Sequence, residues 1–138
     1  MNYFLIFFIS FCFSLLIGSG FYGFGHDFYV SYYKSNIAWG DFGDQLGWIL
    51  STLTIYKVHV GVYLASFVLS LSVGLLLFKT TYGYFCKKNY WLFFLLYLIL
   101  IHTWPVIMST SNVMRQGFSM SFLFLALYFL LSKKYFWY

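Results

Sequence analysis

The run Val60-Gly-Val-Tyr-Leu-Ala-Ser-Phe-Val-Leu-Ser-Leu-Ser-Val-Gly-Leu-Leu-Leu-Phe78 contains no charged side chain. A helix needs about 20 apolar residues to cross the hydrocarbon core of a bilayer, at about 1.5 Å of rise per residue. The run is close to that length, and Lys79 follows it directly, as expected where a span meets water. It therefore predicts a membrane-spanning helix over residues 60–78.

Three other apolar runs resemble this one, and the composition of the whole chain agrees with them. Of its 138 residues, 62% are hydrophobic and only 8% are charged, and the mean hydropathy is +0.81. A soluble domain of this size carries far more charge. We therefore expect an all-α, polytopic integral membrane helix bundle, a single membrane domain with four transmembrane helices at residues 3–23, 60–78, 91–108 and 113–131.

The lysines indicate how the spans are oriented, because cytoplasmic loops carry the excess of positive charge. If the amino terminus is cytoplasmic, the inner side collects five cations and no acid, namely Lys79, Lys87, Lys88, Lys133 and Lys134. The outer side then collects three cations and three acids, namely Lys34, Lys57, Arg115, Asp27, Asp41 and Asp44. We therefore expect both termini and the loop 79–90 to be cytoplasmic.

Residues 24–59 form the expected outer loop, which contains many glycines and aromatic residues and all three aspartates. Within this loop, residues 46–56 are apolar but too short to cross the membrane. We expect them to form a helix in the membrane interface that ends near Lys57 and His59, whose side chains extend outward to water. A crossing at this point would place the later lysines outside, against the charge pattern.

Small residues recur at every fourth position in two of the predicted spans. Such ridges let neighbouring helices approach each other closely. We therefore expect helix contacts along Ser10, Ser14 and Gly18 in the first span and along Ser66, Ser70 and Gly74 in the second.

Motifs of soluble enzymes do not occur in the sequence. It has no nucleotide-binding loop, no dinucleotide fingerprint, no zinc-ligand spacing and no serine nucleophile elbow. Cys12 and Cys86 lie in different environments, so they are interpreted as inert thiols. The net charge of +5 is explained by lysines beside the spans. We therefore expect no cofactor, no metal and no nucleic-acid partner.

Arg115 stands at the start of the last apolar run, where a cation is costly unless an anion or water receives it. It also opposes the positive end of the helix dipole, at about 0.3 to 1 kcal/mol. An anionic ligand makes this position favourable for Arg115, because amides at a helix start and a guanidinium together bind phosphate groups. The alternative is an arginine that extends to lipid headgroups.

Two other polar residues allow more than one interpretation. Asp27 is a candidate general base, or the partner that orients one; taken by itself, it is better explained as a solvated loop acid that forms a turn or a salt bridge with Lys34. His102 is a candidate proton carrier, although a hydrogen-bond donor inside the bundle is the more common role for such a histidine. The tyrosines and tryptophans of the outer loop fit sugar stacking and also fit an interface belt.

Three short motifs, taken in order, resemble a known family. They are Gly25-His26-Asp27-Phe28 followed by Tyr32-Tyr33, then Asp44-Gln45-Leu46-Gly47, and finally Asn112-Val113-Met114-Arg115-Gln116-Gly117. The pattern is similar to that of the EpsG family of membrane polysaccharide polymerases, which are relatives of the Wzy-like O-antigen polymerases. Asp44-Gln45 stands where family members usually have Glu-Pro. Family members also continue through more spans, so the resemblance implies an amino-terminal fragment.

The resemblance implies a glycosyltransferase-type reaction on undecaprenyl-diphosphate-linked oligosaccharides. It places this reaction at the outer face of the bacterial cytoplasmic membrane, in the synthesis of exopolysaccharide, capsule or O-antigen. Arg115 would bind the diphosphate without a metal, and Asp27 would act on the acceptor side. The residues expected to bind substrate around them are His26, Tyr32, Gln116 and His102.

Two other function classes fit the same residues. In the first, the chain is a small non-enzymatic accessory membrane protein that contacts other polysaccharide assembly proteins. In the second, it is part of a transporter for a lipid-linked sugar, because polar groups near the mouth of a bundle suit passage as well as catalysis.

Overall fold

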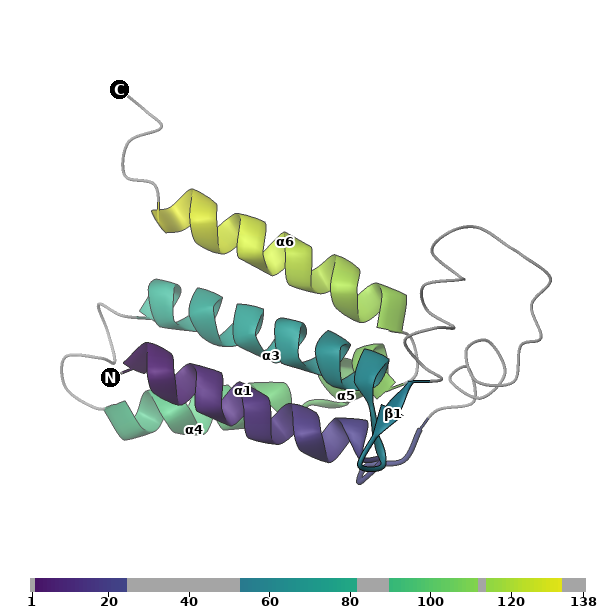
Figure 1. Cartoon of the computed structure of the whole chain (residues 1–138). Helices are drawn as coiled ribbons and strands as arrows, with labels where there is room; N and C mark the ends of the chain where they lie inside the picture. The colour runs from purple at the N-terminus through teal and green to yellow at the C-terminus, as the bar shows by residue number, and fades with distance from the viewer. Residues whose placement is uncertain (1, 25–52, 82–89, 112–113, 133–138) are drawn as a thin grey trace.

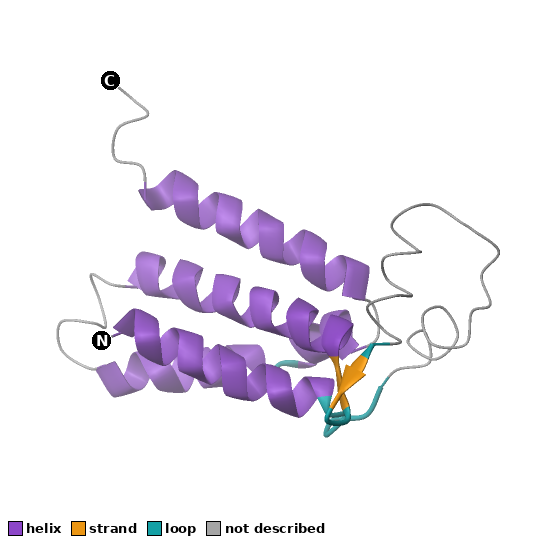
Figure 2. Ribbon diagram, viewed as in Figure 1, coloured by secondary structure: helices purple, strands orange, loops and turns teal. Residues whose placement is uncertain are grey.

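The computed structural model describes residues 2–24, 53–81, 90–111 and 114–132, and most of these are helical. This confirms the all-α expectation. Two two-residue strands form the described β-structure (Figure 2). The elements in chain order are α1 (Asn2–Gly18), β1 (Thr54–Ile55), β2 (Val58–His59), α3 (Val60–Thr81), α4 (Tyr90–Ile101), α5 (Trp104–Ser111) and α6 (Met114–Ser132).

Helix α3 is the centre of the bundle, since it contacts each of the other described helices. Helices α1, α3, α4 and α6 run side by side, with α6 on one side of α3 and with α1 and α4 on the other (Figure 1). The end of α1, the β-hairpin, α5 and the start of α6 lie together; we name this the hairpin end. The end of α3 and the start of α4 lie at the opposite end, which we name the Lys79 end.

Small residues bring α1, α3 and α4 together. All six predicted ridge residues are buried, including Ser10 on α1 and Gly74 on α3. A Cβ atom at Gly74 would lie 2.6 Å from Ile6 Cγ2 and 2.9 Å from Tyr97 Cζ, so only glycine leaves room for these two side chains. The ridges therefore mark the contact surface of the bundle, as predicted.

A buried hydroxyl of α4 connects the same three helices. Tyr97 is fully buried, and its hydroxyl donates to the carbonyl oxygen of Ser70 over 2.9 Å. Since a tyrosine hydroxyl has one hydrogen, Ser10 Oγ must donate to Tyr97 Oη across the remaining 2.6 Å. The chain from α1 through α4 to α3 therefore leaves none of these hydroxyls unpaired in the core.

Helix α1 ends earlier than the predicted span of residues 3–23. Gly20 has φ +78°, and its N–H donates to Ile17 O over 3.0 Å, while Phe21 N donates to Leu16 O over 3.1 Å. These two bonds form a Schellman cap with glycine in the left-handed position. The cap stops α1 at Gly18 and turns the chain toward the hairpin.

The sequence predicted a single helix over residues 91–108, and this prediction is wrong. The segment forms two helices, α4 and α5. Pro105 has no N–H to donate to the carbonyl of Ile101, and its ring clashes with a continuous helix. Helix α4 ends at Ile101, and the carbonyl of Thr103 accepts from Val106 and Ile107 to begin α5. Pro105 then lies in the first turn of α5, where its missing donor costs little.

The prediction of an interfacial helix over residues 46–56 is also wrong for its last residues, from Thr54 onward. Thr54–Ile55 is a strand that pairs with Val58–His59. Between them, Tyr56 and Lys57 both have positive φ, 49° and 66°, as in the two-residue turns that suit the twist of a hairpin. Residues 46–52 lie outside the described residues.

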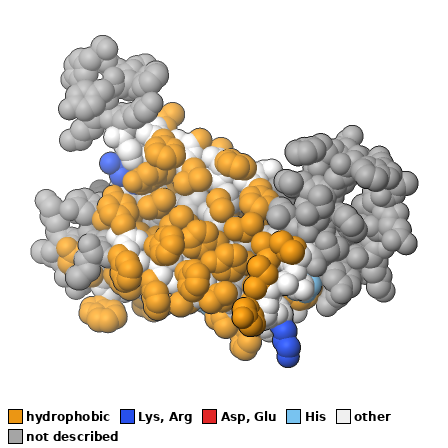
Figure 3. Space-filling model, in the orientation of Figure 1, with side chains coloured by type: hydrophobic (Ala, Val, Ile, Leu, Met, Phe, Trp, Pro, Cys, Tyr) orange, Lys and Arg blue, Asp and Glu red, His pale blue; other side chains and the backbone are white. Residues whose placement is uncertain are grey.

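Apolar side chains cover the outside of the bundle. Figure 3 shows them over the helices of one face, with lysine side chains near its two ends. Among the described residues, α3 alone is long and apolar enough to cross a membrane, while α1, α4 and α6 are apolar but shorter. The first and third predicted spans are shorter because of the Schellman cap and Pro105.

Candidate site at the hairpin end

The predicted site residues divide into a described group and a group outside the described residues. His26, Asp27 and Tyr32 fall in residues 25–52 and belong to the second group. Phe24 and Leu53, which border that segment, both lie at the hairpin end: Phe24 contacts the ring of His59 at 4.8 Å, and Leu53 O accepts from Val60 N. The predicted outer loop therefore leaves and rejoins the bundle at this end.

Helix α6 brings the predicted Arg-Gln pair to the same end. The backbone of Arg115 lies in the first turn of α6, and its side chain lies outside the described residues. The side chain of Gln116 is exposed and does not pack in the core of the bundle. The first turn contains no acidic residue. The amides of a first turn have no partner within the helix, so this helix start is suited to an anion.

Small residues hold this start of α6 in place. Gly117 is buried directly after Gln116, and Ser121 is fully buried one turn later. The Ser121 hydroxyl donates to Gly117 O over 2.6 Å, so it is satisfied within the helix. The helix packs on α3 and α5. The backbone that carries Arg115 and Gln116 therefore rests on a packed element.

His102 is the predicted site residue whose contacts the structure describes most fully. It lies in the break between α4 and α5, and its side chain is exposed. Its Nδ1 lies 2.8 Å from the carbonyl oxygen of Leu98. Its ring packs edge-on at 5.0 Å from Phe13 and at 6.1 Å from Tyr22. The hydrogen bond predicted for His102 is therefore made to Leu98, one helical turn earlier in the chain, and not to another helix.

Thr103 fixes the backbone beside His102. The Thr103 hydroxyl donates to Leu100 O over 2.7 Å, and its backbone N–H donates to the same oxygen over 3.2 Å. The break thus satisfies the polar groups of Thr103 locally, although Pro105 interrupts the helical pattern. His102 is held on a defined turn rather than on a free loop.

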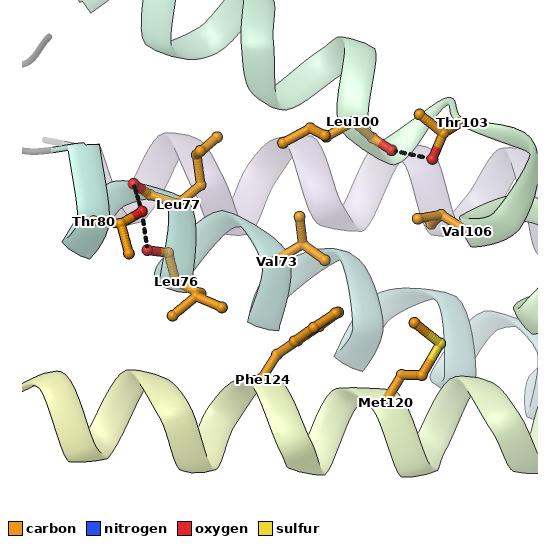
Figure 4. A pocket seen from close by; sticks show the side chains of 9 residues that line it. All are labelled: Val73, Leu76, Leu77, Thr80, Leu100, Thr103, Val106, Met120 and Phe124. Atoms are coloured by element: carbon orange, nitrogen blue, oxygen red, sulfur yellow. Dashed lines mark hydrogen bonds between the residues drawn. The ribbon is translucent and has the colours of Figure 1, made fainter.

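Sequence reasoning missed an apolar groove on α3 (Figure 4). It has a volume of about 330 Å³, and it lies between α3, the α4–α5 junction and α6. Its two hydroxyls, on Thr80 and Thr103, both donate to backbone carbonyls. No titratable side chain lines it, so it has no acid-base chemistry. Its lining residues are Val73, Leu76, Leu77, Thr80, Leu100, Thr103, Val106, Met120 and Phe124.

The hairpin end thus joins the start of α6 and both ends of the aspartate-containing segment. Comparison with protein-family models, with curated proteins and with solved structures finds no match. The described residues contain no group of three His, Cys, Asp or Glu side chains that would bind a metal ion. Cys12 is exposed on α1, and Cys86 lies outside the described residues.

Proposed function

We propose that this chain is a multi-pass protein of the bacterial cytoplasmic membrane, with spans made by α1, α3, α4 with α5, and α6. At 22 residues, α3 is about 33 Å long, close to the thickness of a bilayer core. Large apolar side chains on the other helices are exposed, among them Phe4 at 71%, Trp91 at 87% and Leu130 at 70%. Monomeric soluble proteins rarely expose so much apolar surface, which supports this placement.

We further propose that the chain takes part in the polymerisation of undecaprenyl-diphosphate-linked oligosaccharide units at the outer face of that membrane. The product would be an exopolysaccharide, a capsule or an O-antigen, made together with other polysaccharide assembly proteins. The observation that carries the proposal is the position of the start of α6. Arg115 and Gln116 lie in the first turn of this helix, at the end of the bundle where residues 25–52, which contain Asp27, leave and rejoin it.

The proposed chemistry needs a cation on the departing diphosphate and an acceptor near the attacking hydroxyl. Arg115 supplies a planar, permanently charged group that binds phosphate oxygens in pairs, and the first-turn amides of α6 add to it. Asp27 is the first candidate, and His26 the second, for the group that acts on the attacking hydroxyl. Tyr32 and Gln116 bind the glycan. No metal is required for this arrangement.

Replacing Arg115 tests the proposal directly. In cells whose surface glycan depends on this chain, Arg115→Ala and Arg115→Lys are expected to reduce polymer by about 100-fold or more, because each removes paired contacts to the leaving diphosphate. Gel analysis of glycan chain length and immunoblotting of the protein measure the two quantities needed. Lys57→Ala is the matched control, since Lys57 is an exposed cation at the same end, and it is expected to retain wild-type polymer. Wild-type chain length in Arg115→Ala would refute the diphosphate role.

The break between α4 and α5 favours a second candidate function. Helices interrupted within the membrane are common at the substrate sites of transporters. In this alternative, the chain moves a lipid-linked sugar across the membrane. Transport of a fluorescent lipid-linked sugar in vesicles, with no increase in glycan length, would support the transporter over the polymerase.

A further inference from the structure

The apolar groove follows one face of α3 (Figure 4). Four of its lining residues come from this helix and are spaced three and four apart: Val73, Leu76, Leu77 and Thr80. This spacing places them on one face, over about 10 Å of the helix. Thr80 lies at one end of the groove, beside Lys79, and Met120 of α6 lies at the other (Figure 4).

The lining of the groove suits an apolar occupant. The Thr80 hydroxyl donates to Leu76 O over 3.0 Å, and the Thr103 hydroxyl donates to Leu100 O over 2.7 Å, so both hydroxyls are satisfied within the chain. No titratable side chain lines the groove. A polar ligand would find no partner there and would lose its hydrogen bonds to water.

The size of the groove favours a flexible chain over a helix. Its volume of about 330 Å³ is room for about ten groups of the size of a water molecule or a methylene, at about 30 Å³ each. A helix is about 10 Å wide with its side chains, so it would send only single side chains into this space. An acyl chain can follow the length of the groove.

A positive charge lies beside one end of the groove. Lys79 directly precedes Thr80 in the last turn of α3, and its side chain is exposed. The three aspartates of the chain all fall in residues 25–52, so no carboxylate of the described residues pairs with this lysine. Basic residues beside spaces between membrane helices attract anionic lipid headgroups, above all on the cytoplasmic side.

We propose that the groove binds one acyl chain of an anionic glycerophospholipid of the cytoplasmic leaflet, with the lipid phosphate at Lys79. The bound chain fills the space between α3, the α4–α5 junction and α6. This site rests on the proposed placement of the bundle in the membrane, with the Lys79 end in the cytoplasm. It does not depend on the proposed polymerisation of a glycan.

Native mass spectrometry of the full chain tests the charge with two probes of identical acyl chains. These are phosphatidylglycerol, which is anionic, and phosphatidylcholine, which has no net charge. The wild type is expected to bind phosphatidylglycerol about fivefold more tightly, the factor that one basic residue contributes near an anionic lipid surface. Lys79→Gln is expected to abolish this preference. The control Lys57→Gln, which removes an exposed cation at the hairpin end, is expected to keep it.

Substitutions in the groove test the acyl-chain site. Met120→Trp takes up space in the groove, so binding of either lipid is expected to fall by about tenfold. Its control is Leu123→Trp, which places the same ring at an exposed position of α6 that does not line the groove. Val106→Leu adds one methylene group from the opposite wall, and it is expected to weaken binding in the same direction, so the test stands if Met120→Trp does not fold.

Several outcomes would overturn the proposal. Equal binding of the two lipids by the wild type, or a preference that survives Lys79→Gln, would remove the role of the charge. Full binding in Met120→Trp, displacement of the phospholipid by an equal concentration of a polyprenyl phosphate, or a dimer that Met120→Trp abolishes would assign the groove to another occupant. If these results arise while cysteine labelling confirms the membrane orientation, only the lipid site fails. If the labelling contradicts that orientation, the proposed placement fails, and the lipid site fails with it.

Discussion

Tyr97 connects three helices through one hydroxyl group, and its effect on stability follows from that position. Tyr97→Phe keeps the ring that fills the space opposite Gly74, but leaves Ser10 Oγ without its partner and removes a bond to Ser70 O. We expect the free energy of unfolding to fall by about 1 to 3 kcal/mol, as for other buried groups that lose a partner.

Reversible denaturation of the full chain in detergent measures the effect of Tyr97→Phe. Tyr90→Phe is its control, because that side chain is half exposed at the start of α4. We expect the control to change stability by no more than about 0.5 kcal/mol. Equal stability of Tyr97→Phe and the wild type would show that the hydroxyl chain contributes nothing.

At the scale of the element, the end of α1 depends on a glycine in the left-handed conformation. Gly20 has φ +78°, and a Cβ atom there would lie 2.8 Å from Phe24 Cε2; Gly23 has φ +76° with nothing within 4 Å of its Cβ position. Alanine at either site incurs the backbone cost of about 1 to 2 kcal/mol. We expect Gly20→Ala to be the more destabilising, because it also displaces the Phe24 ring. Thermal unfolding of both variants measures the difference, and an equal loss would contradict the contact.

Helix boundaries are the part of the fold that sequence reasoning placed least well. Apolar length alone predicted a helix through Gly20 and another through Pro105, yet the first helix ends at Gly18 and the second is broken at His102 and Thr103, just before Pro105. The reason is local, since a positive φ and a missing N–H outweigh apolar continuity. The strands beside Tyr56 were missed for a related cause: neither Tyr56 nor Lys57 is a residue typical of that turn.

Across the whole molecule, composition predicted a helical bundle, and the spacing of serine and glycine predicted which helix faces are buried. Tyr97 could not be singled out, because the sequence contains 14 tyrosines and burial depends on the partner helices. The groove beside Met120 was equally hidden, since its lining comes from four consecutive helices and depends on how they pack together. His102 was identified as a candidate, but its contact with the carbonyl oxygen of Leu98 depends on the break in the helix, which apolar length does not predict.

We propose that the bundle spans the membrane with the hairpin end outside and the Lys79 end in the cytoplasm. Lys57, in the hairpin turn, and Lys79, in the last turn of α3, mark these two ends, and both side chains are exposed. In a background with Cys12→Ser and Cys86→Ser, Lys57→Cys and Lys79→Cys each provide one thiol for a membrane-impermeant maleimide. We expect labelling of Lys57→Cys in intact cells, and labelling of Lys79→Cys only after the membrane is permeabilised. Labelling of both in intact cells, or the reverse pattern, would contradict it.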